Sequence, residues 1–194
     1  MSPKGKTEDG QEIRWLSQDQ VRRFLNAIPQ DAVRDRLLFA FLYRFGMRVS
    51  EACLLPVEAV ARKRWEVTIQ GLKGGLRRTY TVPRDLRPLI KSWRPSGDTF
   101  FAGRQGGLSR VRVWQLFRQC AAEAGIPKEF NVHSLRHSAA VHALDAGLAT
   151  EDVRDLLRHR RLSTTDVYAN LSTRRRNDYL GRLERSESIV KMRM

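Results

Sequence analysis

The feature that most constrains the fold is an apolar segment with helical spacing in the first quarter of the chain. Its large apolar residues are Val33, Leu37, Leu38, Phe41, Leu42 and Phe45. Because they recur at helical intervals, they share one face of a helix that runs from Asp31 to Phe45. Gly46 follows directly, and a glycine in the left-handed conformation often ends a helix at this position. We therefore predict a helix with a sharp exit at Gly46.

Further helices are predicted on both sides of this one. Ser17 is placed to cap a helix that ends before Pro29, and a short helix from Val49 to Leu55 ends at Pro56. The other predicted helices run from Arg84 to Trp93, from Ser109 to Ala124, from Ser134 to Asp145 and from Thr150 through Leu157, followed by a short helix that carries Tyr168 and a basic helix after Ser172 and Thr173.

The pattern changes to that of a β-hairpin in the middle of the chain. Trp65, Val67 and Ile69 alternate with polar residues, and a second strand-like run covers residues 78–82. Glycines separate the two runs, which places Lys73 at the turn. The predicted fold class is therefore mainly α with a small antiparallel β-sheet (α+β).

Length and composition favour one main folded unit. The chain has 194 residues, of which 41% are apolar, enough to bury a core without metals or disulfides. We expect a disordered leader or linker at 1–13, the main domain at 14–172 and a basic helix or tail at 173–194. Cys53 and Cys120 lack a disulfide spacing and are interpreted as buried thiols. No apolar run reaches the ~18 residues of a membrane span, so we expect no membrane partner and a cytoplasmic protein.

The charge of the chain favours a nucleic-acid partner. Its formal net charge is +15 and its pI is about 10.9. Lysines and arginines that neutralise phosphates release the counterions of a polyanion, which drives association. A solvated basic surface without a specific partner, or attraction to anionic lipid, are the alternatives.

Residues suited to attack on a phosphodiester follow one another along the chain. Their order is Arg48, Lys73, His133, Arg136, His159 and Tyr168, with the two central residues in a His-x-x-Arg arrangement. Such a reaction requires a nucleophile, cations for the non-bridging oxygens and a proton for the leaving oxygen. A tyrosine, two imidazoles and three cations supply these groups. Arg48 is predicted to lie in a tight corner between helices, which would hold it firmly.

The histidines leave one alternative open. His133 and His137 are four positions apart on a predicted helix, with His142 nearby, which is a spacing found in zinc sites. Arg136 lies between them and would repel a cation from that face, and no acidic or cysteine ligand has a supporting spacing. We therefore expect no metal here. Glu51 has two interpretations, either as a residue that orients Arg48 or as the partner of a surface cation.

This set of residues resembles the catalytic domain of the tyrosine recombinases of the phage integrase family. The resemblance extends from about Leu16 to Leu171. It implies that Tyr168 attacks the phosphorus and leaves a 3′-phosphotyrosyl bond and a free 5′-hydroxyl, while Arg48 and Arg136 clamp the phosphate. The reaction it implies uses neither a metal nor a cofactor.

The resemblance also assigns the remaining residues and the partners. His133 is similar to the acid–base histidine of the family, and His159 to the residue that donates a hydrogen bond to a non-bridging oxygen. Lys73 resembles the mobile lysine that protonates the leaving 5′ oxygen. The implied partner is double-stranded DNA, bound by a homo-tetramer on two sites whose tails are exchanged between protomers. A monomer without DNA is the alternative.

Two departures from the family pattern stand out. Arg158 occupies the position before His159, where the family usually has glycine. Too few residues precede Ser17 for the N-terminal helical domain of most relatives, so we expect either an excised catalytic domain or a short recombinase of the kind that inverts promoters.

Site-specific recombination is the function that these observations predict. A type IB topoisomerase shares the arginine, lysine and tyrosine roles, but it commonly has a lysine where this chain has His133. A DNA-binding module without catalysis is the second alternative. Formation of a covalent DNA adduct distinguishes an enzyme from a binding module.

Overall fold

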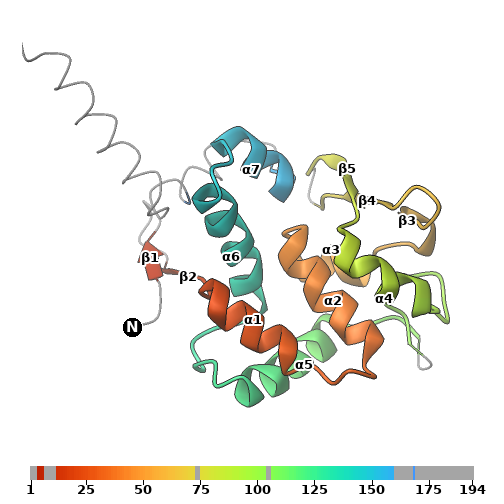
Figure 1. Ribbon diagram of the computed structural model, residues 1–194, viewed down its shortest axis with the longest axis horizontal. Helices are drawn as coiled ribbons and strands as arrows, with labels where there is room; N and C mark the ends of the chain where they lie inside the picture. Colours follow the sequence, from red (N-terminus) through yellow and green to blue (C-terminus); the bar gives the residue numbers. More distant parts are fainter. Residues whose placement is uncertain (1–3, 7–11, 73–74, 104–105, 160–167, 169–194) are drawn as a thin grey trace, which may run out of the picture.

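A bundle of helices with a small sheet at one side forms the structure (Figure 1). The computed structural model describes residues 4–6, 12–72, 75–103, 106–159 and 168. The helices are α1 (Gln18–Asn26), α2 (Val33–Arg44), α3 (Val49–Cys53), α4 (Arg87–Ser92), α5 (Arg110–Glu123), α6 (Val132–Asp145) and α7 (Thr150–Leu157). The strands are β1 (Lys4–Lys6), β2 (Glu12–Arg14), β3 (Val60–Ala61), β4 (Glu66–Gln70) and β5 (Arg77–Thr81). The predicted fold class, mainly α with a small antiparallel sheet, is confirmed.

Helix α2 forms the centre of the core. Its side chains from Leu37 to Leu42 are all buried, and the helix contacts α1, α3, α4 and α6. The ring of Phe41 packs edge-on against Phe45, at 4.9 Å between centroids. Gly46 has a φ of 51°, so the predicted left-handed exit from this helix is confirmed.

Side-chain caps set where the helices begin. Ser17 and Gln20 form a capping box at the start of α1, as the sequence predicts. Helix α6 starts at Val132, earlier than the predicted Ser134, because Asn131 accepts a hydrogen bond from the His133 amide at 2.8 Å. The hydroxyl of Ser134 in turn accepts from the Asn131 amide at 3.2 Å. This cap places His133 in the first turn of the helix.

The sheet has three antiparallel strands in the order β3-β4-β5. Its hairpin pairs Val67 with Tyr80 and Ile69 with Arg78, and both apolar residues of β4 are buried. The sequence did not predict β3, since two residues carry no readable alternation. Helix α7 lies beside this sheet and above α6 (Figure 1). Residues 73–74, which include Lys73 of the predicted hairpin turn, lie outside the described residues.

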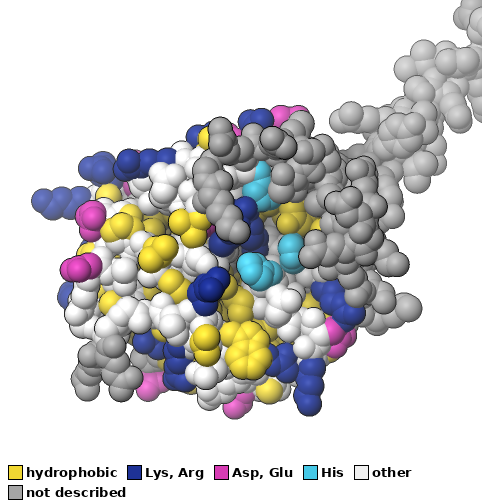
Figure 2. Space-filling view, turned by 180° about the vertical axis from the view of Figure 1, so that it is seen from behind, with side chains coloured by type: hydrophobic (Ala, Val, Ile, Leu, Met, Phe, Trp, Pro, Cys, Tyr) yellow, Lys and Arg dark blue, Asp and Glu magenta, His cyan; other side chains and the backbone are white. Residues whose placement is uncertain are grey.

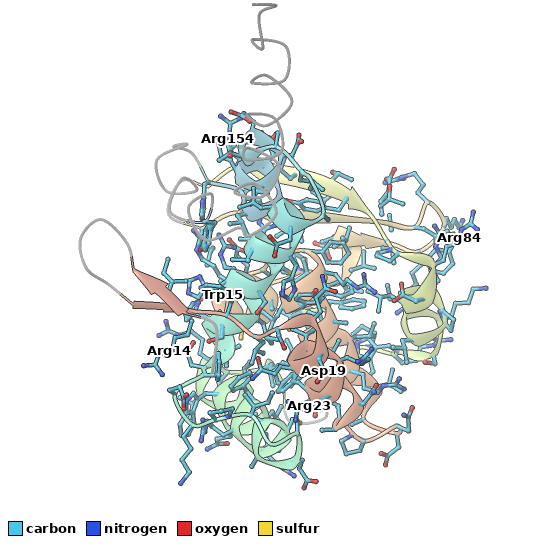
Figure 3. All side chains as sticks on the ribbon, turned by 60° about the vertical axis from the view of Figure 1, so that its left-hand side comes forward. Arg14, Trp15, Asp19, Arg23, Arg84 and Arg154 are labelled. Atoms are coloured by element: carbon cyan, nitrogen blue, oxygen red, sulfur yellow. The ribbon has the colours of Figure 1, made fainter. Side chains whose placement is uncertain are left out.

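A second apolar cluster connects the N-terminal region to α6 and α7. It contains Ile13, Ala140, Val141, Leu144, Val153, Leu157 and Tyr168. Trp15 packs against it from the segment that joins β2 to α1, beside α6 (Figure 3). Strand β1 pairs with β2 in antiparallel register, and Lys4–Lys6 lies within the region 1–13 for which a disordered leader or linker is expected. For 1–3 and 7–11, which the structure does not describe, that expectation stays a prediction.

None of the described helices combines the length and apolarity needed to cross a bilayer. Both cysteines are free thiols, with Cys120 buried and Cys53 half-buried. Burial raises the pKa of each thiol.

Replacing Gly46 with alanine is expected to destabilise the fold by about 1–3 kcal/mol. A Cβ atom there would lie 2.6 Å from Leu157 Cδ2, and an L-residue is strained at this φ. Urea unfolding of the variant measures the loss. Gly107→Ala is the matched control, because its nearest neighbour is Thr99 Oγ1 at 4.0 Å. An equal loss in both variants would contradict the expectation.

Candidate active site

Arg48 is held in the corner between α2 and α3. The chain leaves α2 through the left-handed Gly46, and Arg48 then becomes the extended N-cap residue of α3. Glu51 accepts hydrogen bonds from the Arg48 amide and from its Nη1, both at 2.9 Å. One carboxylate therefore positions the backbone and the guanidinium of Arg48, whose side chain remains 33% exposed.

Glu51 is the buried anion of a cluster of arginines. Its fully buried carboxylate lies 2.7 Å from Arg158 Nη2 and 3.9 Å from Arg136 Nη1, in addition to Arg48. Burial opposes ionisation, but Arg158, the Arg48 amide and Arg136 outweigh it, so the pKa of Glu51 is lowered. Of its two interpretations, orientation of Arg48 is the one found. One negative charge faces three positive charges, so the cluster keeps a net charge of about +2.

Arg136 lies one turn after His133 on α6 and is only 4% exposed. Its guanidinium donates to the carbonyl of Gly46 and to that of Leu157, the latter at 2.8 Å. Burial and the charge of Arg48 lower the pKa of Arg136 to about 9, against the opposing effect of Glu51. It therefore remains a cation at neutral pH. His133 is exposed, and its pKa is lowered by partial desolvation and by the charges of Arg136 and Arg48.

His159 follows the end of α7 and contacts Arg136. Its Nε2 is 2.8 Å from Arg136 Nη2, and the residue is 5% exposed. A guanidinium only donates, so Nε2 accepts and the proton of the neutral ring lies on Nδ1. Burial, with the charges of Arg136, Arg48 and Arg158, lowers the pKa of His159 to about 3. This imidazole is thus neutral at physiological pH.

Tyr168 is almost fully buried, with 5% exposure, and packs in the second apolar cluster. Its hydroxyl lies 2.9 Å from His137 Nδ1. Burial raises the pKa of Tyr168, while the charges of Arg136 and Arg48 oppose the shift. The phenol is therefore protonated at neutral pH, and it lies within electrostatic range of both guanidinium groups.

The structure brings most of the predicted site residues into one region. Arg48, His133, Arg136, His159 and Tyr168 converge through the contacts and charge interactions described above. Figure 2 shows histidine side chains next to Lys and Arg side chains on one face. Lys73 lies outside the described residues, but its neighbour Leu76 donates an amide hydrogen bond to Arg158 O at 3.3 Å. The base of the hairpin therefore lies at the edge of the cluster.

Sequence reasoning missed two residues of this region. The sequence suggests His137 only as a zinc ligand, yet its Nδ1 is hydrogen-bonded to the Tyr168 hydroxyl. No group of three metal-ligating side chains occurs among the described residues. Arg158 was noted only as a departure from glycine, and that departure was the one signal in the sequence. The structure places its guanidinium inside the cluster, fully buried, and its backbone has a φ of 59°.

Two histidines of this region, the buried His159 and the partly buried His137, predict a loss of stability in acid. The folded-state pKa is about 4 for His137 and about 3 for His159, both lowered mainly by burial. In the unfolded chain these histidines have a pKa of about 6.5. Below that pH the unfolded state binds more protons than the folded state. The free energy of unfolding therefore decreases as pH falls toward the folded-state pKa values, by about 1–2 kcal/mol per histidine near pH ~5.

Urea unfolding between pH 7.5 and 5 measures this effect. His137→Gln removes one of the histidines whose pKa is lowered in the folded state, so the variant should lose less stability on acidification than the wild type. An unchanged pH dependence in His137→Gln would contradict the assignment.

Comparison with known proteins identifies relatives across most of the chain. The model of the Phage integrase family matches residues 14–175. Tyrosine recombinase XerA of Pyrococcus furiosus is 33% identical over 183 residues, which cover 90% of this chain and 63% of the relative. Tyrosine recombinase XerC of Erythrobacter litoralis is 33% identical over 174 residues, which cover 84% of this chain and 56% of the relative. The chain therefore spans less than two thirds of the length of these relatives.

Solved structures share the fold. A crystal structure of XerA recombinase has a TM-score of 0.72 at 22% identity, covering 93% of this chain and 66% of the other. XerH site-specific recombinase bound to the palindromic difH substrate has a TM-score of 0.71 at 23% identity, covering 92% and 53%. With the family match across residues 14–175 and this shared fold, the chain belongs to the phage integrase family.

Proposed function

We propose that the protein is a site-specific recombinase that cuts and rejoins double-stranded DNA through a 3′-phosphotyrosyl intermediate. The reaction would serve DNA integration, excision or inversion. The observation that carries this proposal is the convergence of Arg48 and Arg136 on the buried phenol of Tyr168, whose pKa both charges influence. The relatives named tyrosine recombinases support it.

The two arginines are proposed to hold the scissile phosphate. Negative charge gathers on the equatorial oxygens as phosphorus is attacked, and guanidinium groups stabilise that charge with paired hydrogen bonds. The net positive charge of the cluster around Glu51 supports this role. Arg48 is the more accessible of the two, so an incoming phosphate would meet Arg48 and the exposed His133 first.

Tyr168 is proposed as the nucleophile. Its oxygen forms the bond to phosphorus while the bond from phosphorus to the 5′ oxygen breaks. The phenol proton has to leave, for which we propose His133 as the acid–base group, and Lys73 would give a proton to the 5′ oxygen. His159 would donate to a non-bridging oxygen. Tyr168 and His159 are 5% exposed, so they must become more accessible when DNA binds.

Double-stranded DNA is the proposed partner, in a tetramer that holds two sites. The net charge of +15 supports a polyanionic ligand, as does the shared fold with XerH, which is bound to its difH substrate. Such a reaction would take place in the cytoplasm. A type IB topoisomerase and a catalytically inactive binding module remain the rivals, and relatives named recombinases favour the first proposal over both.

Trapping the covalent intermediate tests the chemistry. A nicked duplex, carrying a site that the protein itself selects from a random-sequence DNA pool, should accumulate an adduct with the wild type. Tyr168→Phe should form none, whereas Tyr43→Phe should form it normally, since that hydroxyl only contacts His142 among the described residues. Arg48→Ala and Arg136→Ala should each slow the adduct by about 100-fold or more.

Two results would overturn this proposal in different ways. Selected DNA that binds the wild type without any adduct would favour the binding module. Relaxation of an arbitrary supercoiled plasmid by the monomer would favour the topoisomerase.

Salt provides a separate test of the DNA interface. Affinity for duplex DNA should fall by about 10-fold or more between roughly 50 and roughly 200 mM salt, because each neutralised phosphate releases counterions. A fluorescence anisotropy titration at several salt concentrations measures the slope. An affinity that does not respond to salt would contradict a basic DNA-binding face.

A further inference from the structure

Arg158 is a fully buried cation whose two terminal guanidinium nitrogens both donate hydrogen bonds, whereas its Nε has no hydrogen-bond partner among the described residues. Its side chain is 0% exposed. Its Nη1 donates to Phe45 O at 2.9 Å, Leu156 O at 2.8 Å and the Tyr80 hydroxyl at 2.9 Å, and its Nη2 donates to Gly46 O at 3.1 Å and Glu51 Oε2 at 2.7 Å. These partners come from α2, α3, β5 and α7 or their ends. One side chain thus joins the elements that surround the arginine cluster.

We propose that Arg158 is a positioning residue that balances the buried charge of Glu51, keeps Arg48 and Arg136 oriented for phosphate, and connects them to the β4–β5 hairpin. This inference rests on the proposed function, because the phosphate is the one that the two arginines would hold. Arg158 itself is buried and would not touch the substrate.

Arg158 contributes to the charge of the site. Glu51 is shared, since Arg158 Nη2 lies 2.7 Å from its Oε2 and Arg48 Nη1 lies 2.9 Å from its Oε1, whereas Arg136 Nη1 is 3.9 Å from Oε2. With three cations around one carboxylate, Arg158 balances much of the buried negative charge, so the cluster keeps a net charge of about +2 for an incoming anion. Without Arg158, the carboxylate would be balanced by Arg48 and Arg136 alone. The phosphate site would then lose about one unit of positive charge.

Arg158 also holds the β4–β5 hairpin in place. The Tyr80 hydroxyl on β5 accepts from Arg158 and donates to Leu156 O at 3.0 Å, and the guanidinium carbon lies 5.6 Å from the centre of the Tyr80 ring. The backbone of Arg158 also accepts the Leu76 amide at 3.3 Å. Side chain and backbone of one residue therefore hold both ends of β5 near the cluster. These contacts fix where β5, and with it the β4–β5 hairpin, lies relative to the cluster.

The backbone supports a role for the side chain. Arg158 has a φ of 59°, a conformation in which glycine is unstrained and arginine is not. The strain of this residue is offset by the contacts of its guanidinium. Arg158→Gly removes the side chain and relieves the backbone, whereas Arg158→Gln removes the guanidinium and leaves the backbone strained, so comparing the two variants separates the effects.

Substitutions at Arg158 test the inference through the rate of adduct formation at saturating DNA. Arg158→Gly and Arg158→Gln, corrected for the folded fraction from urea unfolding, should be slower by about 10-fold to 100-fold, since small displacements of reacting groups have effects of that size. Arg158→Lys, which keeps the charge, should recover part of the rate. Arg22→Gln is the charge-matched control, because this exposed arginine on α1 pairs only with Asp19 among the described residues.

A double variant tests whether Arg158 acts through Glu51. If it does, Glu51→Gln combined with Arg158→Gln should be no slower than the slower single variant, because groups that act as a unit are not additive. A purely structural role predicts lower stability with a normal rate per folded molecule. That result, or fully additive losses, would overturn the inference.

Inorganic phosphate provides a readout that does not require cleavage. Phosphate that binds the folded protein raises the urea midpoint. At constant ionic strength it should raise the midpoint of the wild type and of Arg22→Gln, and raise it much less in Arg158→Gln and Arg48→Ala. A wild type that forms no adduct but shows this pattern would overturn the proposed function and leave the inference standing. Equal phosphate shifts and equal adduct rates in wild type and Arg158→Gln would do the reverse, and a wild type with neither response would overturn both.

Discussion

The site depends on the ion pairs and hydrogen bonds that the carboxylate of Glu51 forms. This carboxylate is fully buried, and a buried charge is tolerated only when paired charges and hydrogen bonds replace its hydration. Three guanidinium groups and one backbone amide do so here, from the corner before α3, from α6 and from the end of α7. Elements distant in the sequence are therefore drawn to one point. A neutral residue in this place would leave buried cations without a counter-charge.

The surroundings of this carboxylate have a consistent electrostatic character. Cations remain charged, whereas the neighbouring imidazoles are driven toward their neutral forms by burial and by the same positive charges. A region with excess positive charge and neutral histidines attracts an anion strongly. The phenol of Tyr168 is nevertheless protonated, because burial outweighs the charges of Arg136 and Arg48.

The sequence was informative where local rules apply. Helical spacing and the glycine after Phe45 predicted α2 and its left-handed exit, and Ser17 predicted the start of α1. Alternation predicted β4 and β5 but could not reveal the two-residue β3. The start of α6 was predicted too late because the capping asparagine lies before the first apolar residue, Val132.

These local rules could not predict contacts between residues that are distant in the sequence. Some hydrogen bonds of the site join residues far apart in the chain. They connect His137 with Tyr168, and Arg158 with Phe45 and Glu51. No periodicity encodes such pairs, because they arise only when α6, α7 and the corner after α2 pack together. The predicted set of site residues came from a family resemblance rather than from spacing alone, and its functional roles stay predictions.

The carbonyl groups around the arginines have a further consequence. Arg136 and Arg158 donate to Phe45 O, Gly46 O, Leu156 O and Leu157 O, which lie at the C-terminal ends of α2 and α7. Such helix ends have partial negative charge and favour cations. Unlike carboxylates, these dipoles align a guanidinium without cancelling its charge. Two helix termini thus hold both guanidinium groups in place and preserve a positive electrostatic potential in the protein interior. Any change that unwinds the end of α2 or of α7 would weaken that potential.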